Sequence, residues 1–166
     1  MRARGFAMGL AAALVVFAFG RGRVLADEGK RAPTIEIGVI YAAHSDGGTF
    51  IDPALRDLPQ LTRDKPFIRY NVYKVLDKAR LPLDVGLPRT VPLVNGRTLQ
   101  ITLVSVETAA GPPPEPRFHV RVAIGRPGKA AFLKLLEVTA GENEPFFVGG
   151  QSYRGGTLFL ELVMRP

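Results

Sequence analysis

The chain has 166 residues, of which 46% are hydrophobic and 22% are charged, with a net charge of +7 and no cysteine. This length predicts one domain that can bury a hydrophobic core, and the composition excludes global disorder. The lack of cysteine excludes disulfides, a thiolate nucleophile, a cysteine-based zinc site and the lipid-bearing cysteine of bacterial lipoproteins.

The N-terminus has the pattern of a cleavable secretory signal peptide. A basic segment, residues 1–5, precedes an uncharged run at residues 6–20. This run is shorter than the roughly 20 residues of a membrane-spanning helix, which favours a signal peptide over a membrane anchor. We expect cleavage after Ala26, with Gly20 as the alternative, so that mass spectrometry of the exported protein should find Asp27 first.

The predicted signal peptide, residues 1–26, also explains much of the basic charge. It contains four arginines and no acidic residue, so the predicted mature chain has a net charge of only +3. This low charge argues against a nucleic-acid partner. We therefore expect a periplasmic or secreted protein that contacts the membrane only through the signal segment, if that segment is not cleaved.

The mature chain is predicted to begin with a flexible leader, residues 27–33. A strand is expected at residues 34–42, because its apolar residues alternate with a period of two. A polar loop follows, and then Asp52-Pro53 predicts the start of a short helix near residues 53–63. Asp can cap the free N–H groups and Pro suits the first helical position, whereas Pro59 should break or reset the helix.

The rest of the chain is predicted to form strands. The candidates alternate apolar residues or are rich in β-branched and aromatic residues, and they cover residues 67–77, 89–94, 97–107, 118–124, 132–139, 145–148 and 157–164. Residues 132–139 also allow a helical turn. Asn95-Gly96 predicts a tight hairpin, because its turn needs positive φ at both central residues. Residues 109–116 predict a proline-rich connection, and residues 149–156 a glycine-rich bend.

About eight short strands with turns between them are typical of an antiparallel all-β fold. Strands do not alternate with helices, so a parallel α/β sheet is not expected. We predict a single β domain over residues 34–166, either a sandwich or a partly open barrel, with one short helix near residues 53–63.

The sequence offers few residues for chemistry. His44-Ser45-Asp46 has the residue types of a hydrolase triad, but neighbours in a loop cannot form the hydrogen-bonded line of a triad. His44, Asp46 and His119 are the metal-site candidates, although no histidine spacing supports a metal ligand. We expect His119 to be a solvated histidine on the outward side of a strand. No catalytic or cofactor-binding residue and no cofactor is predicted.

By elimination, the sequence favours a non-enzymatic binding or structural module of the cell envelope. Its expected partner is another envelope protein or a polysaccharide. One alternative is a secreted hydrolase that acts through surface carboxylates, which would need two converging carboxylates in a pocket. The other alternative is a carrier of a small apolar ligand, which would need an apolar cavity.

Overall fold

The computed structural model describes residues 32–127 and 132–166, without the side chains of residues 132–135. The predicted signal peptide and residues 27–31 of the predicted leader lie outside the described residues. Within the described part of the chain, no helix is long and apolar enough to cross a membrane.

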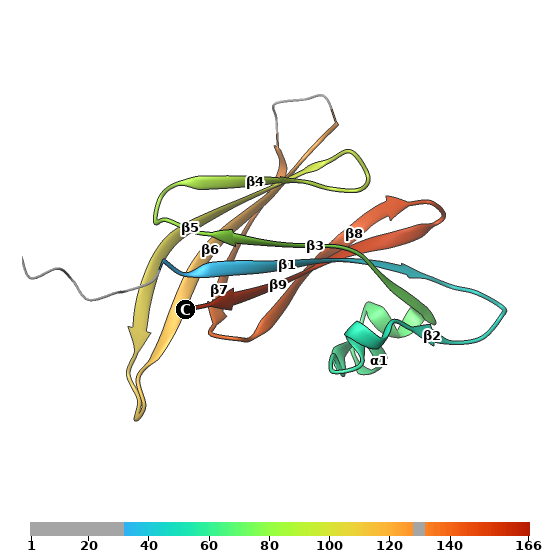
Figure 1. Cartoon of the computed structure of the whole chain (residues 1–166), viewed down its shortest axis with the longest axis horizontal. Coiled ribbons are helices and arrows are strands. Elements are labelled where there is room, and N and C mark those ends of the chain that lie inside the picture. Colours follow the sequence, from blue (N-terminus) through green and yellow to red (C-terminus); the bar gives the residue numbers. More distant parts are fainter. Residues whose placement is uncertain (1–31, 128–131) are drawn as a thin grey trace, which may run out of the picture. The chain divides into compact units, whose positions relative to one another are not determined.

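Two β-sheets form the fold (Figure 1). The five-stranded sheet has the order β2 (Phe50–Ile51), β3 (Val72–Pro82), β1 (Thr34–Ala43), β9 (Gly156–Arg165) and β8 (Pro145–Tyr153). The four-stranded sheet has the order β4 (Pro88–Pro92), β5 (Thr98–Ala109), β6 (Glu115–Gly125) and β7 (Phe132–Gly141). All pairs are antiparallel except β2 with β3. The prediction of an all-β, sandwich-like fold is confirmed.

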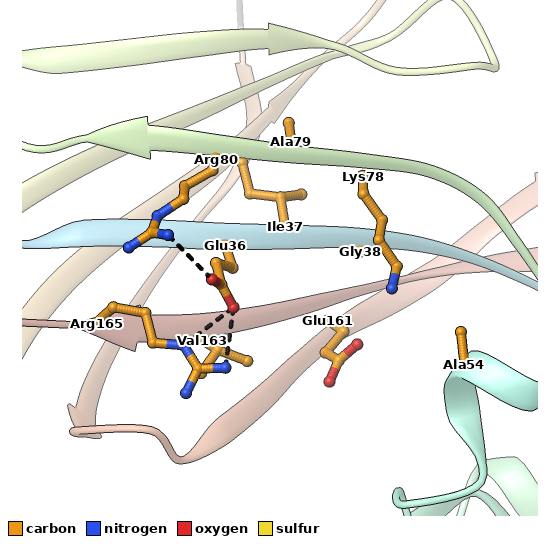
Figure 2. A pocket seen from close by; sticks show the side chains of 10 residues that line it. All are labelled: Glu36, Ile37, Gly38, Ala54, Lys78, Ala79, Arg80, Glu161, Val163 and Arg165. Atoms are coloured by element: carbon orange, nitrogen blue, oxygen red, sulfur yellow. Dashed lines mark hydrogen bonds and ion pairs between the residues drawn. The ribbon is translucent and has the colours of Figure 1, made fainter.

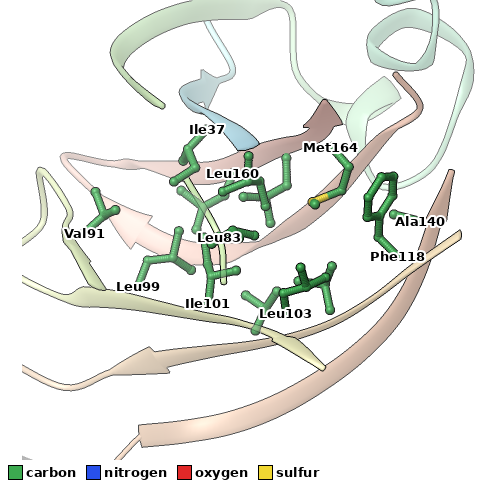
Figure 3. Packing of buried hydrophobic residues seen from close by; sticks show 14 of the residues in the cluster. Ile37, Leu83, Val91, Leu99, Ile101, Leu103, Phe118, Ala140, Leu160 and Met164 are labelled. Atoms are coloured by element: carbon green, nitrogen blue, oxygen red, sulfur yellow. The ribbon is translucent and has the colours of Figure 1, made fainter. Parts of the chain in front are cut away.

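The main hydrophobic core contains residues of both sheets (Figure 3). Alternation along each strand sends every second side chain to one side. The alternating residues of β1 and β9 therefore meet those of β5 and β6 in one cluster, which includes Ile35, Ile37, Val39, Leu158, Leu160, Leu162, Met164, Leu99, Ile101, Leu103, Val120 and Val122. Full burial of each such side chain contributes roughly 1.5–3 kcal/mol to folding.

The predicted Asn-Gly hairpin joins β4 to β5. Gly96 has φ of +75°, and its N–H donates to the carbonyl of Leu93 at 2.9 Å. The predicted positive φ at both Asn95 and Gly96 was wrong, because only Gly96 has it, and the hydrogen bond closes the turn from Leu93 to Gly96. Glycine reaches this left-handed conformation at little cost.

Three short helical turns lie between β2 and β3, and we call residues 53–69 the helical cap. They are a 3₁₀ turn at Pro53–Leu55, α1 at Gln60–Arg63 and a second 3₁₀ turn at Phe67–Arg69. The predicted capping by Asp52 is present, because its carboxylate accepts from the N–H of Ala54 at 3.0 Å. The predicted break is also present, since α1 begins directly after Pro59.

The helical cap covers one part of the outer face of the five-stranded sheet. Its apolar residues pack in a second cluster against side chains of β1, β3 and β9, with the buried members Ile40, Ala42, Leu55, Leu61, Phe67, Tyr73 and Phe159. Tyr73 is anchored there, because its hydroxyl donates to the carbonyl of Phe67 at 2.6 Å. No other helix of the described residues covers the rest of this outer face.

Two other local predictions were wrong, and one short strand was not predicted. Residues 67–69 form a helical turn, and the strand begins only at Val72. Residues 149–153 continue β8 and do not form the predicted bend. The strand accommodates the glycine pair by a bulge between Gly149 and Gln151. The short strand β2 was not predicted, because its two residues are too few to show a period.

Candidate functional site

A groove of about 490 Å³ crosses the part of the outer sheet face that the helical cap leaves open (Figure 2). We call it the charged groove. Five of its lining residues are charged and the others are small or apolar, namely Glu36, Ile37, Gly38, Ala54, Lys78, Ala79, Arg80, Glu161, Val163 and Arg165. Ala54 is the helical cap's contribution to this lining.

Strand register explains why the charged side chains meet. Glu36 lies opposite Arg80, while Gly38 lies opposite both Lys78 on β3 and Glu161 on β9. Residues two apart on a strand, and their direct partners on neighbouring strands, point to the same side of a sheet. Central β1 thus places one acid and one glycine between the charged residues of its two neighbours.

Gly38 has no side chain and therefore leaves space at the bottom of the groove. A side-chain carbon added at this position would lie 3.1 Å from a carboxylate oxygen of Glu161. A larger residue on this central strand would therefore project into the space between the charged side chains.

Glu36 is held between two arginines (Figure 2). The Nε of Arg165 donates to Oε2 of Glu36 at 3.0 Å, and Nη1 of Arg80 lies 3.8 Å from Oε1. Both carboxylate oxygens thus face a guanidinium, which fixes the orientation of the Glu36 side chain. Such half-exposed ion pairs add little stability, about 0–1 kcal/mol each.

Glu161 is a partly buried acid in a different situation. No hydrogen bond or ion pair joins its carboxylate to another described residue. Burial raises its pKa above the ordinary value of 4.5, while Lys78 and Arg165 oppose this shift and Glu36 adds to it. The groove therefore holds one carboxylate fixed by two arginines and one carboxyl group that has a raised pKa and no ion-pair partner among the described residues.

Lys78 is the third cation of the groove. Among the ion pairs formed by the described residues, none involves its ammonium group. The lining side chains have a net charge of +1, or +2 when Glu161 is protonated. An unpaired cation beside an unpaired carboxyl group can receive a ligand that offers both an anionic group and a hydrogen-bonding partner.

The structure places the predicted metal-site candidates apart. His44 and Asp46 lie in the loop after β1, where Nε2 of His44 is 4.0 Å from Oδ1 of Asp46. His119 lies on β6, with its Nε2 3.3 Å from Oε1 of Glu107 and its Nδ1 3.2 Å from the hydroxyl of Thr139. In residues 32–127 and 132–166, no three His, Cys, Asp or Glu side chains gather as a metal site would require.

The charged groove was missed in the sequence. Its signal is a set of charged residues on the outward positions of three strands: Glu36 with Gly38, Lys78 with Arg80, and Glu161 with Arg165. Each short pattern is ordinary on a strand surface. Only the strand order, which places β1 between β3 and β9, combines them into one site.

The chain matches no protein-family model, no curated protein and no solved structure in our comparisons.

Proposed function

We propose that this protein is an exported, non-enzymatic binding module of the cell envelope that holds an acidic polysaccharide in the charged groove. The observation that carries the proposal is the pair of unpaired groups, Lys78 and Glu161, on either side of Gly38. A sugar acid offers a carboxylate to Lys78 and hydroxyl groups to the carboxyl group of Glu161.

The charge of the groove supports an acidic ligand over a neutral one. Three cationic side chains line it, and Glu36 is already engaged by Arg80 and Arg165. An arriving carboxylate is attracted to the remaining positive charge, and an open sheet face suits a polymer that extends beyond the site. Because these charges are exposed, we expect the binding to weaken as salt is added.

A hydrolase is the second candidate, because two carboxyl groups lie on one face and one of them has a raised pKa. A glycosidase uses such an acid together with an ionised base or nucleophile. Here the partner carboxylate would be Glu36, and its contacts with two arginines occupy its oxygens and make them less free to move. This arrangement favours binding over hydrolysis.

Calorimetric titration of the purified protein with a hexamer of galacturonate tests the proposal. We expect saturable binding, and we expect a neutral glucose hexamer to give none. Lys78→Met should weaken galacturonate binding about tenfold, because a hydrogen bond to a charged group is lost. Lys74→Met is the matched control on the same strand, because Lys74 lies over the ring of Phe50 and outside the groove.

Equal affinity for the two hexamers, or an equal loss in Lys78→Met and Lys74→Met, would contradict the acidic-ligand proposal. New reducing ends during the titration would show hydrolysis and support the second candidate.

A further inference from the structure

The carboxyl group of Glu161 lies in the charged groove where an anionic ligand has to pass. Glu161 on β9 is the direct partner of Gly38 on central β1, and Gly38 is also the partner of Lys78 on β3. A side-chain carbon at Gly38 would lie 3.1 Å from Oε2 of Glu161, so the carboxyl group borders the space above this glycine. A ligand that reaches the ammonium group of Lys78 through this space therefore comes near the carboxyl group (Figure 2).

The neighbouring strands supply Glu161 with no ion-pair partner. On β1, the carboxylate of Glu36 lies 2.9 Å from Nη2 of Arg165 and 3.8 Å from Nη1 of Arg80. Both guanidinium groups are thus engaged by the other acid of the groove. On β8, the direct partner of Glu161 is the uncharged Phe147.

Lys78 is influenced by a second acid, which belongs to the start of the helical cap. Hydrogen bonds from the N–H groups of Ala54 and Val75 lower the pKa of Asp52, and the charge of Lys78 contributes to the same shift. At Glu161, burial raises the pKa, and the charge of Lys78 reduces this rise without cancelling it. One ammonium group therefore does not neutralise Glu161.

A bound polymer of sugar acids brings further negative charge to this place. A ligand carboxylate on Lys78 and an ionised Glu161 would repel each other, because like charges side by side disfavour ionisation. Uptake of a proton by Glu161 removes the repulsion, and the protonated group also becomes a hydrogen-bond donor to the ligand. Binding of the polyanion and protonation of Glu161 should therefore favour each other.

We propose that the charged groove binds its acidic polymer together with one proton, which Glu161 takes up from the solvent. This inference rests on the polysaccharide-binding function proposed above and adds its regulation by pH. Because the complex holds more protons than the separate molecules, the affinity falls as the pH rises. The groove thus holds the polymer in mildly acidic surroundings and releases it more readily in alkaline ones.

Calorimetric titration with the galacturonate hexamer measures the proton directly. At pH 6 the titration is repeated in cacodylate and in Bis-Tris, two buffers that differ in their heat of ionisation. We expect the binding heat of the wild type to differ between the buffers as uptake of up to one proton requires. We also expect binding to be about tenfold weaker at pH 8 than at pH 5, where the carboxylates of the hexamer are still ionised.

Glu161→Gln tests the assignment, because the amide resembles the protonated acid in shape and cannot ionise. This variant should give the same heat in both buffers and the same affinity at pH 5 and pH 8, so that at pH 8 it binds the hexamer more tightly than the wild type. Glu115→Gln is the matched control, because Glu115 lies on β6 outside the groove. It should keep the pH dependence of the wild type.

The outcomes separate this inference from the proposed function. Binding of the hexamer without proton uptake, or an equal pH dependence in the wild type and Glu161→Gln, would overturn the role of Glu161 and leave the polysaccharide site standing. Absence of binding at every pH would overturn both.

Discussion

Two glutamates of the same sheet face show how the surroundings of a residue set its chemistry. Glu36 and Glu161 both line the charged groove, but Glu36 contacts two guanidinium groups and Glu161 contacts none. Burial dominates at Glu161 and raises its pKa. The neighbouring cations reduce the shift without cancelling it, so the protonated form of Glu161 is favoured by folding.

This difference predicts how stability changes with pH. Between the ordinary pKa of 4.5 and the higher folded value, the folded protein binds more protons at Glu161 than the unfolded chain does. The free energy of unfolding should therefore fall as the pH rises through this interval, and above the folded pKa the loss of stability should stay constant. In Glu161→Gln this pH-dependent loss of stability should be absent.

Thermal unfolding of the wild type and Glu161→Gln from pH 4 to pH 8 measures the effect. We expect the wild type to lose stability relative to the variant as the pH rises. A difference that is constant over this range, or that changes in the opposite direction, would show that burial does not control Glu161.

At the scale of elements, the close approach of β9 to β1 begins at Gly156. A side-chain carbon at this position would lie 2.5 Å from the carbonyl oxygen of Ala42 and 2.5 Å from the ring of Tyr41. The backbone of Ala42 cannot move aside as a flexible side chain can. A glycine at position 156 is therefore required for β9 to pair with β1 from the start of β9.

Gly156→Ala should lower the free energy of unfolding by about 1–3 kcal/mol, the usual cost of overpacking. Gly47→Ala is the control, because its nearest neighbour would be the hydroxyl of Ser45 at 3.4 Å in an exposed loop, and it should change stability by less than about 0.5 kcal/mol. Chemical denaturation of both variants checks this, and an equal effect would mean that Gly156 is not tightly packed.

Most elements could be predicted because alternation and turn chemistry are local. The strand at residues 34–42, the break at Pro59 and the Asn95-Gly96 hairpin depend on near neighbours in sequence. Residues 67–69 were misassigned because Phe67 belongs to the helical cap and packs on Phe159 of β9, whereas Ile68 is exposed. The charged groove could not be predicted, because it depends on which strands are neighbours.

At the scale of the two packed sheets, the five-stranded sheet is used on both faces. One face contributes to the main core, and the other is shared between the helical cap and the charged groove. The change from the apolar cluster around Phe159 to charged residues around Gly38 separates a packing surface from the surface for which we propose binding.

The central claim is that the charged groove is the binding site, and Gly38→Leu tests it most directly because it keeps every charge and fills only the space. We predict that this variant binds the galacturonate hexamer about tenfold or more weakly, the scale of one lost charged contact, at an unfolding temperature close to that of the wild type. Gly47→Leu, outside the groove, should bind as the wild type does. Undiminished galacturonate binding by a folded Gly38→Leu protein would contradict the claim.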